Sequence, residues 1–321
     1  MKDESPKPKT GPCRAHPPQL DGVLVLDKPK GLTSAACISK IKKGLEQKKI
    51  GHAGTLDPMA TGVLLVLLGQ ATKLSGHLMD DGDKIYSGRI RLGVVTDTWD
   101  AEGRVLEERP VPRLTHTALE DVMASLVGSY EQEVPPYSAA KHQGRPLYEL
   151  ARKGLETPVK KKRVTISCGE AELVGPAHIR FRVTCGSGTY IRSLAHSLGI
   201  RLKCGAMLEE LTREYSHPFG MDQARSLEDV LTDPEGFPQK MRDIAHALPG
   251  WPHLHVSREE EAAIRNGARL PYAARPLPGQ VFAPGMRALL LGADGKALAL
   301  AGTALEKGAS VWALTRGLWN Q

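Results

Sequence analysis

Residues 51–62 read GHAGTLDPMATG and run directly into the apolar segment VLLVLL at residues 63–68. The apolar segment has the length of a strand and contains no polar residue, which is typical of a strand buried on both faces of a sheet. The twelve preceding residues hold three glycines and a proline, and they predict a loop at the end of that strand. We therefore expect a loop that presents His52 and Asp57 beside a buried central strand.

The carboxylate of Asp57 has two interpretations. In most Asp-Pro turns the side chain only accepts a backbone hydrogen bond. Its apolar surroundings favour a functional group instead, because a carboxylate there needs a charged or hydrogen-bonding partner to stay ionised. Arg192, early in a predicted helix after the loop Gly186-Ser187-Gly188, is the candidate partner. Without that pairing, Arg192 is an ordinary surface residue.

Composition limits the classes that the chain can belong to. It has 321 residues, of which 41% are hydrophobic and 25% charged, so disordered proteins are excluded. No apolar run approaches the roughly 18 residues of a membrane span, and the formal charge of +7 favours polyanionic partners. The 33 glycines and 23 prolines imply many turns, which suits a mixed α and β fold. The five cysteines form no C-x-x-C pair, so a disulfide framework and a zinc ribbon do not fit, and we expect a cytoplasmic protein.

Other catalytic motifs are missing from the sequence. The glycine-rich loop is not followed by Gly-Lys-Ser or Gly-Lys-Thr, so it is not a phosphate-binding P-loop. The 11 histidines include no H-E-x-x-H, and we predict no metal site. A serine hydrolase would need a G-x-S-x-G elbow, which is absent.

The chain divides into a tail and two predicted domains. Residues 1–20 mix Lys, Asp, Glu and Pro without an apolar stretch, and they predict a disordered tail and no targeting signal. Residues 21–249 form the larger domain, and Pro249-Gly250-Trp251-Pro252 is a linker. Residues 250–321 predict a small, mostly β domain with a capping-box helix and a hairpin at Asp294-Gly295. In the larger domain we expect strands at residues 23–26, 63–68, 84–92, 164–173 and 178–185, and helices at residues 34–44, 114–127, 146–153 and 189–198.

A basic stretch covers residues 141–163. It contains eight Lys or Arg against two Glu, a net charge of +6. For an arbitrary basic run a solvated face is the usual explanation, and phosphate binding is the functional one.

Five motifs together resemble the TruB family of tRNA pseudouridine synthases, which isomerise the T-loop uridine at tRNA position 55. The first four are DKPKGLTS at residues 27–34, GHAGTLDPMATG at 51–62, KIY to LG with TDT at 84–98, and PPYSA with the residues up to Gly154 at 135–154. The fifth is GTYIR at 188–192. One departure is Thr212, where the family usually has an arginine between residues matching Leu211 and Arg213.

The resemblance implies a fold and a reaction. The fold would be α+β, a mixed and largely antiparallel central sheet flanked by helices, with a small C-terminal β-barrel of the PUA type. The reaction breaks the C1′–N1 bond of uridine, turns the base and joins C1′ to C5, and it needs no cofactor. Asp57 would be the essential carboxylate, as nucleophile at C1′ or C6 or as base at C2′; Arg192 would pair with it, and Tyr86 would stack on the base and help to remove the C5 proton.

Further residues would bind the RNA by the same resemblance. His52 would fill the space left by the flipped nucleotides, Leu211 would be an apolar wall, and Lys28 would buttress the active-site loop. An RNA-binding thumb would span about 135–163. The remaining predicted substrate-binding residues are Tyr190, Lys141, Arg152, Lys160, Lys161, Lys162 and Arg163.

Two other classes of function compete with this hypothesis. One is an RNA-binding or tRNA-folding protein without catalysis, against which the presence of Asp57, Tyr86 and Arg192 argues. The other is a hydrolase of the C1′–N1 bond, which would need a second carboxylate and a water site. The expected partner is the T-loop and elbow of tRNA, with no membrane and no protein partner, and the protein is expected to be a monomer.

Overall fold

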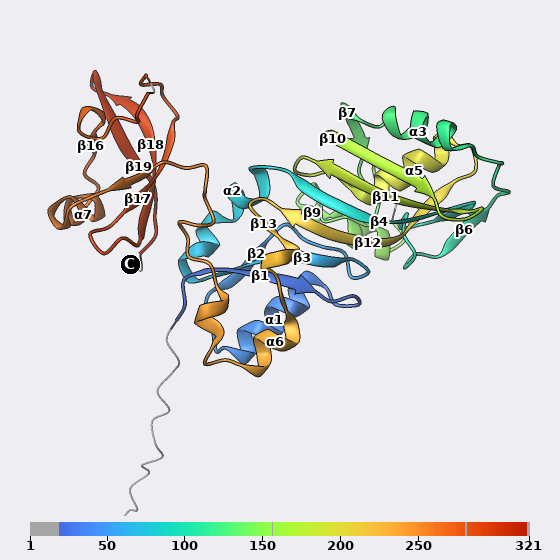
Figure 1. The fold of residues 1–321 in the computed structure, drawn as a ribbon, viewed down its shortest axis with the longest axis horizontal. Helices are drawn as coiled ribbons and strands as arrows, with labels where there is room; N and C mark the ends of the chain where they lie inside the picture. The colour runs from blue at the N-terminus through green and yellow to red at the C-terminus, as the bar shows by residue number, and fades with distance from the viewer. Residues whose placement is uncertain (1–18, 156, 280, 320–321) are drawn as a thin grey trace, which may run out of the picture.

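The computed structural model describes residues 19–155, 157–279 and 281–319. They form a ten-stranded sheet and a separate five-stranded sheet near the C-terminus (Figure 1). Nearly all of the predicted tail, residues 1–18, lies outside these ranges. Within them, no helix combines the length and the apolar character that crossing a membrane requires, and the four cysteines are free thiols.

The middle of the large sheet is the apolar strand that the sequence predicted. Strand β3 (Thr61–Leu68) pairs antiparallel with β1 (Gly22–Lys28), and residues 63–68 are completely buried. The predicted loop over residues 51–62 is too long at both ends, because β2 (Ile50–Ala53) pairs with β3 and takes its first three residues, and β3 takes its last two. The true loop is therefore residues 54–60, a short connection between two paired strands.

The other half of the sheet is antiparallel. Strand β12 (Ala206–Ser216) lies parallel to β3 on one side and antiparallel to β4 (Lys84–Leu92) on the other. The sheet continues through β11 (His178–Cys185) and β10 (Lys161–Leu173) to β7 (Gly128–Glu133) at its edge. The mixed, largely antiparallel sheet is thus confirmed. The short strands β13 (Phe219–Gly220) and β14 (Arg225–Ser226) also belong to this sheet. Two separate two-stranded sheets pair β5 (Val94–Thr96) with β6 (Val105–Glu108) and β8 (Lys141–His142) with β9 (Arg145–Pro146).

Helices cover the sheet at both ends. Helix α1 (Ser34–Gly44) begins where the Thr33 hydroxyl accepts a hydrogen bond from the Ala36 amide. Helices α3 (His116–Ala124) and α5 (Ile191–Arg201) pack on one face of the half that carries β4, β10, β11 and β12 (Figure 1). The shorter helices are α2 (Ser75–Asp80), α4 (Leu147–Arg152) and α6 (Leu227–Thr232).

The C-terminal sheet shares a core with the large one. Its strands are β15 (His253–His255), β16 (Leu270–Pro271), β17 (Arg287–Leu291), β18 (Ala297–Glu306) and β19 (Ala309–Gly317), in the order β15-β17-β18-β19-β16. Helix α7 (Arg258–Arg265) has the predicted capping box of Ser257 and Glu260, and β17 and β18 form the predicted hairpin. Leu289, Leu300 and Leu318 pack in one cluster with Val25 and Leu65 of the large sheet. Apolar contact therefore fixes this sheet to the larger one.

Candidate active site

The predicted ion pair between Asp57 and Arg192 is present. Arg192 Nε lies 2.9 Å from Asp57 Oδ2, and Nη2 donates to Oδ1 at 3.1 Å. The arginine side chain is 6% exposed and comes from the first turn of α5, whereas the aspartate side chain is 34% exposed in the loop after β2. A bidentate guanidinium fixes the carboxylate plane. The geometry therefore holds one aspartate in a defined orientation with its open side toward solvent.

A second carboxylate, which local sequence patterns did not predict, lies behind Arg192. Asp100 Oδ2 is 3.5 Å from Arg192 Nε, and Asp100 Oδ1 accepts hydrogen bonds from the Thr98 hydroxyl and the Glu102 amide. Burial is the main cause of a raised pKa for Asp100, opposed by these hydrogen bonds and by Arg192. In the sequence Asp100 follows Asp97 in an acidic, turn-like segment, and only the fold shows that its side chain is buried.

Arg192 is also held by the backbone of two distant segments. Nη1 donates to the Thr98 carbonyl at 3.1 Å and Nη2 to the Tyr137 carbonyl at 3.0 Å. These contacts join α5 to the segment after β5 and to the Pro-Pro segment before β8. The guanidinium is thus fixed by carbonyls and carboxylates from three parts of the chain.

Lys28 and Ser34 support the loop that carries Asp57 through hydrogen bonds to its backbone. The Lys28 ammonium is completely buried and donates to the carbonyls of Pro29, Leu32 and Pro58 at 2.8, 2.6 and 3.2 Å. Ser34 Oγ both donates to the Leu56 carbonyl and accepts from the Leu56 amide. The buttressing predicted for Lys28 is confirmed. The three carbonyls occupy all three donors of the Lys28 ammonium, and its substrate-binding role stays a prediction.

Tyr86 and Leu211 lie on the same face of the sheet. In the pairing of β4 with β12, Leu211 is opposite Gly88 and Arg213 is opposite Tyr86, and residues two apart on a strand share a face. Tyr86 and Leu211 are each 7% exposed. Burial raises the pKa of the Tyr86 phenol, and the nearby Arg213 cation opposes that rise.

His52 lies in β2, before the loop that carries Asp57, and Tyr190 directly precedes α5, which carries Arg192. His52 Nε2 lies 3.2 Å from the Thr55 hydroxyl, which is the local hydrogen bond within the loop that competes with an RNA-contacting role. Burial, helped by Arg213, lowers the pKa of His52. Tyr190 precedes α5, and its backbone amide and carbonyl both bond to the side-chain amide of Gln132. This bond fixes the start of the helix that carries Arg192.

The basic residues predicted to bind RNA lie mostly at the surface. Arg152 stacks its guanidinium over the Tyr148 ring, 5.6 Å from the centroid. Lys160, which is half-buried, donates to the Lys141 carbonyl and so joins the start of β10 to β8. The ammonium of Lys162 lies against Gly188, in the loop before α5. The exposed members of the group are Lys141, Arg152, Lys161, Lys162 and Arg163.

Thr212, the departure from the family pattern, has a packing role. Its hydroxyl lies 2.8 Å from the Thr61 hydroxyl, across the parallel pairing of β12 with β3. The threonine pair joins the strand after the Asp57 loop to the strand that carries Leu211.

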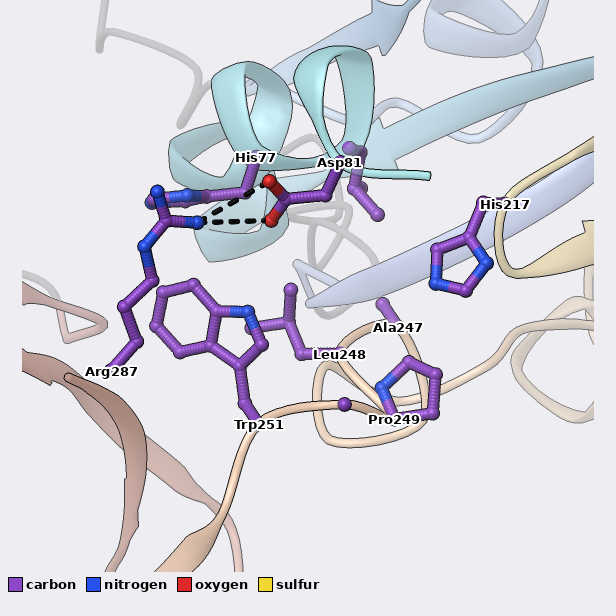
Figure 2. Close-up of a pocket in the computed structure, with 10 residues that line it drawn as sticks. His77, Asp81, His217, Ala247, Leu248, Pro249, Trp251 and Arg287 are labelled. Atoms are coloured by element: carbon purple, nitrogen blue, oxygen red, sulfur yellow. Dashed lines mark hydrogen bonds and ion pairs between the residues drawn. The ribbon is translucent and has the colours of Figure 1, made fainter. Parts of the chain in front are cut away.

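A cavity of about 260 Å³ lies away from Asp57, between α2 and the C-terminal sheet. Figure 2 shows Arg287 and Asp81 facing each other there, with Trp251 beside them. The Arg287 guanidinium is 3.2 Å from Asp81 and lies over the indole of Trp251, and His77 meets that indole edge-on. The Asp81 carboxylate in this lining is therefore occupied by an ion pair, and the cavity lies where α2 meets the C-terminal sheet.

No group of three or more His, Cys, Asp or Glu with metal-ligand geometry occurs among the described residues. Asp57, Arg192 and Tyr86 supply a carboxylate, a guanidinium and a phenol, which are groups suited to nucleophilic or acid–base chemistry.

Comparison with known proteins places this arrangement in a class. The chain is similar to a solved structure described as "Crystal Structure of a Cbf5-Nop10-Gar1 Complex", with a TM-score of 0.70 and 25% identity over 97% of this chain and 91% of that one. It is also similar to "Structure of H/ACA RNP bound to a substrate RNA containing 2'-deoxyuridine", with a TM-score of 0.69 and 24% identity, covering 93% and 85% of the two chains. The fold is that of the pseudouridine synthases.

Sequence relatives narrow the class to one family. The family described as "TruB family pseudouridylate synthase (N terminal domain)" matches residues 42–191. "tRNA pseudouridine synthase B" of Nitratidesulfovibrio vulgaris (strain Hildenborough) is 58% identical over 304 residues, 95% of this chain and all of that protein. The protein of the same name from Oleidesulfovibrio alaskensis is 56% identical over 94% of this chain and 97% of its own. The chain belongs to the TruB family and is a pseudouridylate synthase.

Proposed function

We propose that the protein converts the T-loop uridine at position 55 of tRNA into pseudouridine, with Asp57 as the essential carboxylate. The observation that carries this proposal is the bidentate contact of Asp57 with the buried Arg192. Asp57 lies in the segment at residues 51–62, which resembles the family's catalytic motif. The relatives named tRNA pseudouridine synthase B support tRNA as the substrate, since they match nearly the whole chain.

Asp57 acts in the step that breaks the C1′–N1 bond, as nucleophile at C1′ or C6 or as base at C2′. Arg192 holds the Asp57 carboxylate in a fixed orientation through its two contacts. After the base has turned and C1′ has joined C5, the C5 proton leaves toward Tyr86, the C5=C6 double bond is restored and N1 takes up a proton. Atoms and electrons balance without an oxidant, a reductant or a cofactor.

The target uridine is stacked inside folded RNA, so it must be flipped out at a cost of a few kcal/mol. His52, at the rim of the Asp57 loop, fills the space that the flipped nucleotides leave. Leu211 and the Tyr86 ring, on one face of the sheet, enclose the base.

The RNA backbone is held outside the pocket. The exposed cations between Lys141 and Arg163 bind phosphates, and Lys162 lies beside the loop that precedes Arg192. The C-terminal sheet is a PUA-type RNA-binding domain over residues 250–321, and the catalytic domain is residues 21–249. The protein acts in the cytoplasm as a monomer, without a protein partner.

A product test distinguishes the proposal from its rivals. The protein alone is incubated with unmodified tRNA, and the RNA is mapped for pseudouridine while the supernatant is assayed for free uracil. Pseudouridine at position 55 without uracil is the expected result. Free uracil would identify a hydrolase, and binding without either product would identify an RNA-binding protein without catalysis.

A further inference from the structure

Arg213 is a buried cation beside the site, and no carboxylate of the described residues compensates its charge. It is 1% exposed. Its guanidinium donates to the Val63 carbonyl at 2.7 Å, to the Gly54 carbonyl at 2.9 Å and, from Nη1 at 3.5 Å, to the Tyr86 hydroxyl. In the part of the chain that the structure describes, it forms no ion pair with Asp or Glu.

Such a charge is costly to bury. An arginine does not lose its proton in proteins, so its full positive charge stays in the interior. Carbonyl oxygens offset only part of the desolvation cost of a charge without a counter-ion. A threonine or a glutamine could satisfy a carbonyl more cheaply, so the charge itself calls for a function.

The contact with Tyr86 fixes the direction of the phenolic proton. Guanidinium has donors and no acceptor, so the Tyr86 oxygen must accept from Arg213. The O–H bond of Tyr86 therefore points away from Arg213. The two residues face each other directly across β4 and β12, so the arrangement is set by strand register.

Few other charges face Tyr86. Asp57 in the loop after β2 opposes ionisation of the phenol, and Cys185 on β11, whose pKa burial raises to about 11, is a neutral thiol at physiological pH. Arg213 on β12 favours the ionised phenol. Lys84 on β4 and His52 on β2 face Arg213, and burial lowers the pKa of both. Among the described residues, Arg213 is therefore the cation that contacts this hydroxyl.

We propose that Arg213 is a positioning residue for the isomerisation: it orients the Tyr86 hydroxyl and stabilises its phenolate. The proposal rests on the function proposed above, in which Tyr86 receives the C5 proton. The phenol first releases its own proton to solvent. The C5–H bond then breaks, its electron pair forms the C5=C6 double bond, the proton passes to the phenolate and N1 is protonated by water.

The first test measures the phenol without using activity. The protein is labelled with 3-fluorotyrosine, whose fluorine lowers the phenol pKa toward the range in which the protein stays folded, and is titrated by ¹⁹F NMR. The resonance that is absent in Tyr86→Phe identifies Tyr86. We expect Arg213→Gln to raise the pKa of this phenol by about one unit or more, and Arg213→Lys to raise it less. Equal values in the parent and in folded Arg213→Gln would overturn the proposal.

The second test is a kinetic double-mutant cycle, which also works if Arg213→Gln fails to fold. Arg213→Lys is compared with the parent, and again in the Tyr86→Phe background, by single-turnover pseudouridine formation. In the parent background, we expect Arg213→Lys to lower kcat roughly tenfold with KM nearly unchanged. In the Tyr86→Phe background, the same substitution should lower kcat less than about twofold. Because the phenolate is the active form, the ascending limb of the pH profile, which reports ionisation of the Tyr86 phenol, should move to higher pH in Arg213→Lys.

The same loss in both backgrounds would show that Arg213 only supports the backbone at Gly54 and Val63, and would overturn the proposal. If the parent forms no pseudouridine, the proposed function fails while the NMR titration still decides the coupling of Arg213 to Tyr86.

Discussion

The guanidinium of Arg192 makes a bidentate contact with the Asp57 carboxylate, with Nε 2.9 Å from Oδ2 and Nη2 3.1 Å from Oδ1. Arg192 is buried, and Asp100 and two backbone carbonyls hold its guanidinium in place. The more exposed Asp57 is therefore the member of the pair that can reach a substrate. A carboxylate held by a rigid cation needs little reorganisation when it reacts. Charge and geometry at this pair can therefore be tested separately.

Asp57→Asn tests the charge. Asparagine keeps the shape of the side chain but is neither a nucleophile nor a base of comparable strength. We expect pseudouridine formation to be abolished while tRNA affinity stays within about tenfold, roughly 1.4 kcal/mol. Gel-shift titration gives the affinity and product mapping gives the activity. Turnover near the parent rate would remove Asp57 from the chemistry.

Arg192→Lys tests the geometry. A lysine keeps the positive charge, but a single ammonium cannot make the bidentate contact and also reach the Thr98 and Tyr137 carbonyls. We expect a loss of kcat of about a hundredfold or more with a cooperative thermal transition preserved. Single-turnover rates and circular dichroism melting provide the measurement. Parent-like turnover would mean that Arg192 contributes charge alone.

Gly62→Ala tests the close approach of two strands beside the site. Gly62 has φ +96°, and a Cβ there would lie 2.3 Å from the Arg213 carbonyl oxygen. Gly31 is a matched control, because its φ is +86° but a Cβ would meet nothing within 4 Å. Denaturant unfolding should show a loss of about 1 kcal/mol for Gly31→Ala and roughly 3 kcal/mol for Gly62→Ala. Equal losses would show that β12 moves aside easily.

Local patterns in the sequence were enough to predict most elements of the fold. The strands expected at residues 63–68 and 84–92 are β3 and β4, and the helix expected at residues 34–44 is α1. Strand β2 was missed because its four residues, Ile50–Ala53, include a glycine and are strand only through pairing with β3. Such pairing is a tertiary contact that local propensity does not encode.

The site, like the fold, could be predicted only where local sequence patterns were sufficient. The pairing of Asp57 with Arg192 followed from the need of a carboxylate in apolar surroundings for a cation, and the structure confirms it. Asp100 and the contact of Arg213 with Tyr86 could not be predicted, since an acidic residue in a turn and an arginine on a strand are usually solvated. Their burial depends on α5 and on the β4–β12 register.

His52 predicts a pH dependence of stability. Burial, and secondarily Arg213, lower the pKa of His52 in the folded protein, whereas in the unfolded chain the pKa is about 6.5. The unfolded state therefore binds the proton more tightly, and the folded state loses stability as the pH falls below that value. Relative to His52→Gln, the parent should lose up to about 1 kcal/mol of unfolding free energy between pH 7.5 and pH 5.5. A difference between the two proteins that stays constant with pH would show that His52 is freely solvated.

Lys160, Lys161 and Lys162 predict how phosphate binding separates from chemistry. Changing all three to Gln should remove up to about three counterion-release terms, flattening the slope of log affinity against log salt by roughly 0.7–0.9 for each phosphate that is no longer bound. Phosphate contacts are made equally in the ground and transition states, so they supply uniform binding, and KM should rise while kcat stays nearly constant.

The matched control changes Lys40, Lys42 and Lys43, three exposed lysines in α1. It removes the same charge from another surface. The slope of log affinity against log salt should then stay much closer to that of the parent. Equal slopes in both triple variants and the parent would identify the start of β10 as a solvated face. A fall in kcat alone would show that Lys162, beside the loop before Arg192, helps to position the flipped uridine.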